Sequence, residues 1–452
     1  MLERKIDHDL AVWKSEGAKK ALLIDGARQT GKTFTVREFA ARNYPCFLEI
    51  NFVTMPSASA VFEGDLNADT IITALTAFSR QQLVPHKTLV FLDEIQECPR
   101  ARTAVKFLVE DGRFDYIESG SLLGIRYKPV PSYPVGYETQ LRMFPLDFEE
   151  FLTANNVQSE TVSYLRTCFE KSEPVTEAVH KTIMQLFRYY VITGGMPDAV
   201  QRFVDTHDIA QVVRIQNDIL ALYRQDIAKY AVQDRQRIRD IFDRLPSELN
   251  TKNRRFMLAD IDPSARMNRY ESSFMWLSDA GVVLPCYNVT EPKTPLKINE
   301  LRNLIKVFMN DTGLLCAASV ENVQYEILKD NLDVNMGSIL ENTIAEQLAA
   351  NGFELRYFDR KNFGEVDFLL QQGRAVLPVE VKSGTSYKKH AGLDHIMQSE
   401  EWKIRKAYVL CSGNVEKADN VTYEPWYMAL FIKQLKLPEE MKVAVDLHLL
   451  KK

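Results

Sequence analysis

The stretch GARQTGKT, residues 26–33, constrains the fold of this chain more than any other feature. It matches the pattern G-x-x-x-x-G-K-[ST] in full, follows the apolar run ALLID, and opens the helical segment TFTVREF. A strand, this loop and a helix in that order form a phosphate-binding loop, because backbone N–H groups of the loop and of the helix N-terminus surround phosphate oxygens. The alternative, a plain glycine turn before a helix, fits these flanks less well. The sequence therefore predicts a P-loop domain.

The loop predicts ATP and Mg²⁺ as cofactors. Lys32 is expected to reach the β- and γ-phosphates, and Thr33 to supply a hydroxyl oxygen to Mg²⁺. The residues expected to contact the nucleotide are those of the whole loop: Gly26, Ala27, Arg28, Gln29, Thr30, Gly31, Lys32 and Thr33.

Acidic and polar residues are expected at the ends of neighbouring strands. TLVFLDE places Asp93 and Glu94 directly after an apolar run. Asp93 would bind Mg²⁺, and Glu94 would polarise the attacking water. A polar residue that ends the next strand would sense the γ-phosphate, and Ser119 or Ser121 in YIESGS fits, with Ser119 taken as the candidate.

Short apolar runs between helical stretches predict a parallel sheet that is covered on both faces. The five predicted strands are 21–25, 46–52, 88–94, 114–119 and 139–144. The pattern then becomes helical from about 147 to 230. After residue 263 a helix is followed by two strands around a Pro/Asn/Thr turn, the order of a winged helix. We expect four domains, at 1–150, 151–230, 231–300 and 301–452.

The stretch GEVDFLLQQGRAVLPVEVKSG reads as a β-hairpin. With its turn centred on Gln372-Gly373, Asp367 lies opposite Pro378. Side chains alternate between the two faces of a strand. Three chemically active side chains then share one face: Asp367, Glu380 and Lys382.

Two carboxylates and a lysine on one face of a hairpin are typical of a divalent-metal site. Asp367 and Glu380 would bind the metal, and Lys382 would activate water or stabilise charge on a phosphate. The helix that precedes the hairpin can add Glu341, which borders its apolar stripe, whereas Glu346 points away. The alternatives are a hairpin that has lost catalysis and carboxylates that merely pair with Lys382.

The segments LLIDGARQTGKT, LVFLDEIQE, ESGS, FPLDFEEFL and ITGGMPDAV together resemble bacterial and archaeal AAA+-related P-loop ATPases of largely unknown role. The resemblance spans nearly the whole chain. It implies an α/β fold with sheet order 5-1-4-3-2, a helical lid, a winged helix and a restriction-endonuclease-like domain of PD-(D/E)xK type. The family often has Gly-Arg where this chain has Gly136-Tyr137, so Arg126 and Arg142 are candidate replacements for an arginine finger.

The net charge of −5 excludes a generally basic, nucleic-acid-coating protein, but a local basic face remains compatible with it. The expected DNA contacts cluster around the winged-helix pattern: Lys252, Arg254, Arg255, Arg266 and Arg269. The alternative is a winged helix used only for protein packing or as a lid. No apolar run is long enough to span a bilayer, and the six cysteines form no C-x-x-C pair. We therefore expect a cytoplasmic protein without a membrane partner, and a homo-oligomer is allowed.

Two functions follow from these patterns. The first is an ATP-hydrolysing protein that acts on DNA through the winged helix and the nuclease-like domain. The second is a regulatory ATPase switch whose C-terminal domain binds a partner without cleaving nucleic acid.

Overall fold

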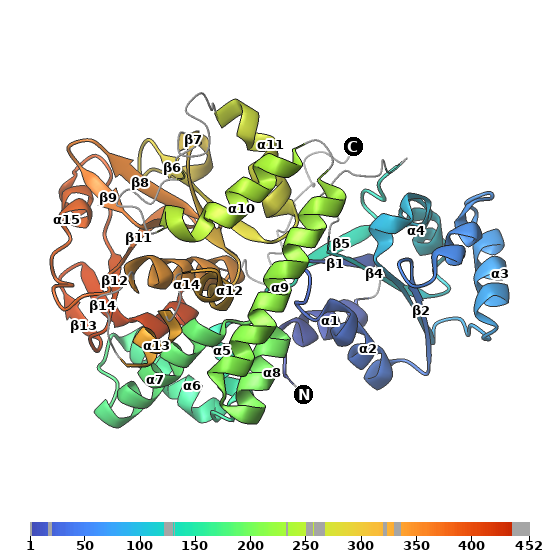
Figure 1. Cartoon of the computed structure of the whole chain (residues 1–452), viewed down its shortest axis with the longest axis horizontal. Helices are drawn as coiled ribbons and strands as arrows, with labels where there is room; N and C mark the ends of the chain where they lie inside the picture. Colours follow the sequence, from blue (N-terminus) through green and yellow to red (C-terminus); the bar gives the residue numbers. More distant parts are fainter. Residues whose placement is uncertain are drawn as a thin grey trace, which may run out of the picture.

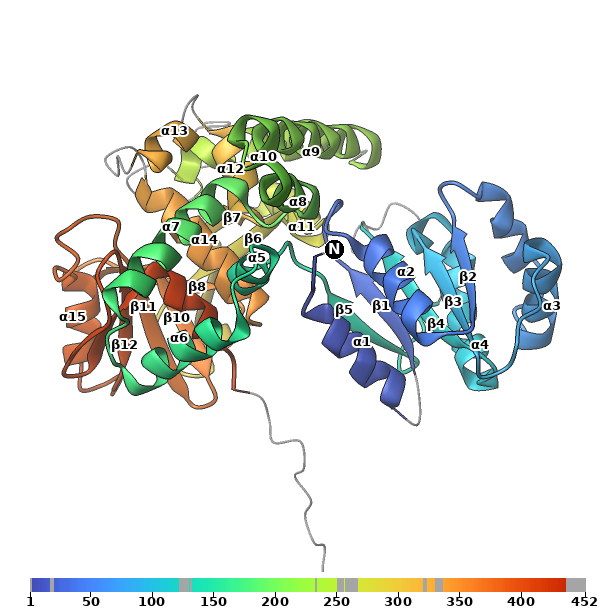
Figure 2. The same cartoon turned by 90° about the horizontal axis from the view of Figure 1, so that it is seen from below.

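The computed structural model has two lobes, with the P-loop lobe on the right of Figure 1 and a larger lobe on the left. Helix α9 (Ile209–Tyr230) runs along the border between them. The N-terminus lies at the junction of the lobes in Figure 2. The residues described are 2–16, 20–121, 130, 132–231, 234–249, 256, 267–319, 323–329 and 336–435.

The P-loop lobe is built on five parallel strands in the order β2-β3-β4-β1-β5. Their bounds are β1 Ala21–Asp25, β2 Cys46–Asn51, β3 Thr88–Asp93, β4 Asp115–Gly120 and β5 Glu138–Arg142. This order confirms the α/β fold and the predicted arrangement 5-1-4-3-2. The carboxyl ends of β1, β3 and β4 therefore meet at one edge, where a P-loop sheet binds its ligand.

Both faces of this sheet are covered by helices, as the continuous apolar strands predict. Alternate residues of β3 face opposite layers: Leu89 and Phe91 pack with α1 and α2, and Val90 and Leu92 pack with α3 and α4. The helices are α1 Ile6–Ser15, α2 Lys32–Asn43, α3 Ala68–Ser79 and α4 Pro99–Asp111.

The next part of the chain is helical and begins the larger lobe. Its elements are α5 Phe148–Ala154, α6 Ser159–Lys171, α7 Glu177–Thr193, α8 Pro197–Thr206 and α9. The corner between α7 and α8 requires glycine, because a Cβ on Gly195 would lie 2.0 Å from the carbonyl oxygen of Leu146. The Gly195 N–H donates to Asp311 Oδ2 at 2.6 Å, which fixes the corner to the rest of the lobe.

The region expected to be a winged helix contains α10 (Arg235–Leu249), α11 (Met267–Asp279), β6 (Val283–Val289) and β7 (Glu300–Met309). β6 and β7 form an antiparallel pair, and β6 also pairs with β8. The resulting sheet has the order β7-β6-β8-β9, with β8 at Arg356–Arg360 and β9 at Gly364–Val366. The predicted boundary at residue 300 thus falls inside a sheet, and the division into four domains stays a prediction.

The C-terminal part adds a five-stranded sheet in the order β10-β11-β12-β14-β13. Its strands are β10 Phe368–Gln372, β11 Ala375–Val381, β12 Ala407–Cys411, β13 Glu416–Ala418 and β14 Val421–Pro425. The helices of this part are α12 Thr312–Ala318, α13 Val323–Leu328, α14 Met336–Ala350 and α15 Ala391–Gln398.

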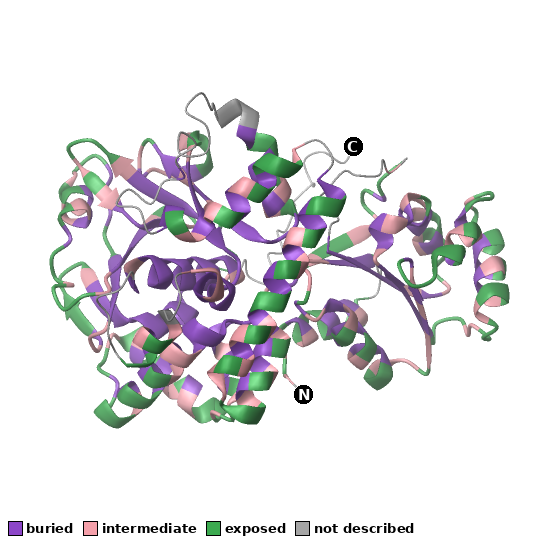
Figure 3. Ribbon diagram, in the orientation of Figure 1, coloured by how far each residue is buried: buried purple, intermediate pink, exposed green. Residues whose placement is uncertain are grey.

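Helix α14 is buried along almost all of its length (Figure 3), and its buried residues include both Glu341 and Glu346. The predicted apolar stripe is buried, but protein packs around all sides of the helix, so the expectation that Glu341 borders the buried face and Glu346 points away from it is wrong. No helix in the described ranges combines the length and the apolar character that a bilayer span requires.

Candidate functional site

The phosphate loop connects β1 to α2 and requires its first glycine. Gly26 has a φ of +143°, and a Cβ there would lie 2.2 Å from the carbonyl oxygen of Met143. Lys32 begins α2, and its Nζ donates to the carbonyl oxygens of Gly26 at 2.9 Å and Ala27 at 2.7 Å. Arg4 of the N-terminal segment also donates to the loop, at the carbonyl oxygen of Thr30.

The ammonium of Lys32 is buried against the loop. Burial lowers the pKa of Lys32 to about 8, although Glu94, Asp93 and Asp25 act in the opposite direction. An anion bound beside this ammonium would favour its charged form and raise the pKa again. The loop therefore has the electrostatic character of a phosphate site.

The acidic edge of the site centres on Asp93, at the end of β3. Its carboxylate accepts hydrogen bonds from Thr33 Oγ1 at 2.9 Å, from Asn51 Nδ2 at 2.8 Å, and from Ser119 Oγ. A carboxylate and a hydroxyl at hydrogen-bond distance fit the oxygen ligands that Mg²⁺ prefers, so Thr33 and Asp93 are the residues that would hold the ion. When bound, Mg²⁺ neutralises charge on the phosphate oxygens.

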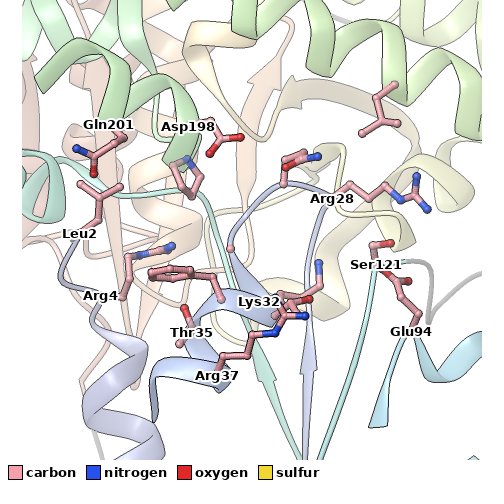
Figure 4. Close-up of a pocket in the computed structure, with 16 residues that line it drawn as sticks. Leu2, Arg4, Arg28, Lys32, Thr35, Arg37, Glu94, Ser121, Asp198 and Gln201 are labelled. Atoms are coloured by element: carbon pink, nitrogen blue, oxygen red, sulfur yellow. The ribbon is translucent and has the colours of Figure 1, made fainter. Parts of the chain in front are cut away.

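Glu94 follows Asp93 in a left-handed conformation, with a φ of +53°. Its Oε2 accepts from Gln96 Nε2 at 2.5 Å, which orients the carboxylate. Glu94, Ser121 and Lys32 line one cavity of about 630 Å³ (Figure 4). Ser119 instead donates to Asp93 from a fully buried position, so Ser121 is the serine that faces the cavity.

The cavity is lined by both lobes of the molecule. The P-loop lobe contributes the loop and α2, and the larger lobe contributes Pro197, Asp198 and Gln201 from α8 and Leu222 from α9. Its volume falls in the range of sites for small organic ligands. Pro197 approaches the loop closely, since a Cβ on Gly31 would lie 3.5 Å from its ring.

Several contacts at this site were not predicted from the sequence. Asn51 ends the second strand and lies beside Asp93 at the end of β3, so a polar residue at this strand end was a usable signal. Arg4, Asp198 and Leu222 come from distant segments with no motif of their own.

The candidate replacements for an arginine finger fall in different places. Arg126 lies outside the described residues. Arg142 ends β5, donates to the carbonyl oxygen of Ser278 at 3.2 Å and lies over the ring of Phe144. Arg142 therefore links the two lobes of one chain. Tyr137, which follows Gly136 where the resemblance implied an arginine, donates to Glu110 at 2.5 Å.

The C-terminal hairpin has a different register from the predicted one. β10 and β11 pair Leu369 with Pro378 and Gln372 with Ala375, so the turn is Gly373-Arg374. Gly373 has a φ of +60° and takes the first central position of the turn, as in a type II′ hairpin. The pairing of Asp367 with Pro378 was therefore wrong. The shift is two residues, which preserves the face of each side chain.

The predicted hairpin residues line a second cavity, of about 510 Å³. Asp367, Glu380 and Lys382 all contribute to it. The Asp367 carboxylate accepts from the Val381 N–H at 2.8 Å, and Lys382 Nζ lies 2.6 Å from Glu380 Oε1. Burial and the neighbouring Asp367 raise the pKa of Glu380 to about 8, while Lys382 acts to lower it.

Glu341 lies elsewhere, in a buried ion pair. Its Oε1 is 2.8 Å from Nζ of Lys306 on β7, and the same Nζ lies 2.6 Å from Oε1 of Glu365. Glu341 does not line the cavity of the hairpin residues. Within the described ranges, no group of three or more His, Cys, Asp or Glu side chains is placed to hold a metal ion. The set Glu341, Asp367 and Glu380 therefore does not fit a three-carboxylate metal site.

The predicted DNA-contacting residues cannot be placed. Lys252, Arg254, Arg255 and Arg266 lie outside the described residues, and so does the side chain of Arg269.

Three parts of the chain match known protein families. Residues 18–152 match the AAA domain family, residues 184–324 match a domain of unknown function (DUF8612), and residues 336–427 match another (DUF4143). No curated protein matches the chain.

Solved structures with similar folds include a Walker-type ATPase of Pyrococcus abyssi, at 13% identity and a TM-score of 0.40, covering 70% of this chain and 96% of that one. The Orc1 protein of Aeropyrum pernix in complex with DNA matches at 14% identity and a TM-score of 0.24, covering 73% and 93%. These similarities are low, so the assignment rests on the family match and on the site itself. Residues 18–152 form a P-loop ATPase domain of AAA type, joined to regions of two families without a known function.

Proposed function

We propose that the chain binds and hydrolyses ATP with Mg²⁺ and works as a switch, in which the nucleotide changes how the two lobes meet. The observation that carries this proposal is that residues of both lobes line the cavity. The phosphate loop forms one wall, and Pro197, Gln201 and Leu222 from the larger lobe form the other. A nucleotide that contacts both walls therefore favours the relative position of the two lobes in which both walls lie within contact distance of it.

Hydrogen bonds connect the corner before α8 to the C-terminal part of the larger lobe. The corner before Pro197 is held by the Gly195 N–H on Asp311 Oδ2, and the N–H of Thr312 donates to Glu346 Oε2 on α14 at 3.0 Å. Helix α14 in turn packs against the C-terminal strands. A shift of α8 on nucleotide binding would therefore move the C-terminal part with it, which supports a partner-binding role for that part.

Lys32→Ala is expected to weaken ATP binding by at least about 30-fold, because a buried cation that pairs with phosphate contributes about 2 kcal/mol or more. Titration of a fluorescent ATP analogue in the presence of Mg²⁺ measures the change. Lys14→Ala, on the helix before the loop, is a matched control that should bind ATP as the wild type does. Equal affinities of Lys32→Ala and the wild-type chain would contradict ATP binding at this loop.

A second candidate function is metal-dependent cleavage of DNA by the C-terminal lobe. One observation favours it: Asp367, Glu380 and Lys382 line a single cavity. With Glu341 paired to Lys306, two of the three predicted carboxylates remain at this site, and Glu365 also lines the cavity. DNA contacts by the basic residues between 252 and 269 belong to this candidate and would weaken steeply with salt.

Under this candidate, Asp367→Asn and Lys382→Ala should differ in a Mn²⁺ titration. Asp367→Asn should lower metal affinity by about ten-fold, because a hard cation needs carboxylate oxygens. Lys382→Ala should keep metal affinity and slow cleavage of a labelled DNA duplex, because its charge acts on the transition state. Glu416→Gln, an exposed carboxylate on β13, serves as the control. If the wild-type chain binds no Mn²⁺ at this site and cuts no DNA in any nucleotide state, the nuclease candidate is overturned. The partner-binding switch is then the function that stands.

A further inference from the structure

Arg28 is the third residue of the phosphate loop, and the loop motif does not require arginine there. Its side chain lines the nucleotide cavity together with Lys32, Glu94 and Ser121 (Figure 4). The guanidinium thus lies on the wall that also carries the predicted water-activating carboxylate.

Helix α9 of the larger lobe holds Arg28 by two contacts. Nη1 of Arg28 lies 3.0 Å from Oδ1 of Asp226, and the hydroxyl of Tyr223 donates to the Arg28 carbonyl oxygen at 3.1 Å. The Arg28 side chain keeps 24% of its surface exposed, so it can exchange this partner for a ligand in the cavity. Burial raises the pKa of the Asp226 carboxyl, and Arg28 acts to lower it while Glu94 acts to raise it.

We infer that Arg28 is a catalytic arginine that acts in cis: its guanidinium leaves Asp226 when ATP binds and contacts the γ-phosphate. The inference rests on the proposed ATP hydrolysis. A guanidinium matches a phosphate with two parallel N–H donors, and the γ-phosphate carries more charge than one carboxylate. ADP lacks this group, so the Arg28–Asp226 pair re-forms after hydrolysis.

The reaction needs water, the Mg²⁺ that Thr33 and Asp93 would hold, and the groups named above. A water oxygen bonds to the γ-phosphorus, the bond between that phosphorus and the bridging oxygen of ADP breaks, and the water proton passes to Glu94. Arg28 keeps its protons and stabilises the negative charge on the γ-phosphate oxygens. This supplies in one chain the arginine that Tyr137 does not provide. The contact also couples the γ-phosphate to α9, because Arg28 releases Asp226 of α9 when it binds the phosphate.

The test compares ATP and ADP on matched variants. Arg28→Ala should lower kcat by about 100-fold and weaken ATP binding about ten-fold more than ADP binding, because only ATP carries the contacted group. Arg28→Lys should recover part of the kcat, since lysine supplies the charge without the two-donor fork.

Asp226→Asn should tighten ATP binding by about two- to five-fold and leave ADP binding unchanged, because the competing carboxylate charge is removed. Arg224→Ala is the control: it breaks another ion pair of α9, with Asp243 at 2.8 Å, and should change neither nucleotide affinity nor kcat. Circular dichroism and thermal unfolding of each variant establish that it is folded.

These measurements separate the inference from the proposed function. A wild-type chain that binds no ATP would overturn both. A wild-type chain that hydrolyses ATP, with an Arg28→Ala variant that keeps the wild-type kcat or loses ATP and ADP affinity equally, would overturn the role of Arg28 and leave ATP hydrolysis intact.

Discussion

Glu94→Gln is expected to bind ATP as tightly as the wild-type chain and to hydrolyse it about 10³-fold more slowly. Glutamine keeps the size of the side chain, and its amide oxygen can still accept from Gln96, so the cavity stays formed. What is lost is a carboxylate that can take the proton of the attacking water. Mg²⁺ and the phosphates would contact other residues, mainly Lys32, Thr33 and Asp93, so the ground-state complex should be preserved.

Single-turnover hydrolysis of labelled ATP, with affinity measured on the same preparation, tests this expectation. Glu97→Gln is a matched control, because it changes a carboxylate three residues along that does not line the cavity. An equal loss in kcat and in ATP affinity would mean that Glu94 holds the nucleotide instead of activating water. An unchanged kcat would mean that Glu94 does not activate the attacking water.

The sequence predicted the P-loop lobe well because its signals are local. The strand ALLID, the loop after it and the helix from Lys32 are contiguous, and a parallel sheet then brings Asp93 beside Thr33. The order of the five strands came from a family resemblance, and the motifs that carry this resemblance in the P-loop lobe lie at the ends of its strands. The shared face of Asp367, Glu380 and Lys382 was predicted for a related reason, because alternation along two paired strands survives an error of two residues in register.

The remaining contacts depend on segments that meet only in the folded chain. Nothing near Asp226 in the sequence indicates that it pairs with a loop residue from the other lobe. Glu341 was assigned to a metal because a helix was expected to have one buried side. Burial around all of α14 instead gave it a partner from β7, and a lysine in that strand carries no sequence signal.

Lys306 is an unusual lysine, since its side chain is fully buried. It lies between two carboxylates, and its Nζ is also 4.9 Å from the centre of the Tyr357 ring. A buried charge is tolerated only when it is paired and hydrogen-bonded. Glu341 is fully buried as well, so each member of this pair depends on the other.

Lys306→Met is therefore expected to lower the free energy of unfolding by about 3–5 kcal/mol, because it removes the ammonium that lies 2.8 Å from the buried Glu341 carboxylate. Urea unfolding followed by tryptophan fluorescence measures the loss. Lys297→Met is the matched control: it removes an exposed lysine paired with Glu354 at 3.5 Å and should cost about 0–1 kcal/mol.

The double variant Lys306→Met, Glu341→Gln separates a structural ion pair from a displaced metal ligand. If the pair is structural, the second change should recover much of the lost stability, because it removes the buried negative charge that Lys306 compensates. Millimolar Mn²⁺ should then leave Lys306→Met as unstable as before. Stabilisation of Lys306→Met by Mn²⁺ that Glu341→Gln abolishes would contradict this account, because it would mean that the lysine occupies the place of a metal ion and that Glu341 is a ligand, as the sequence predicted.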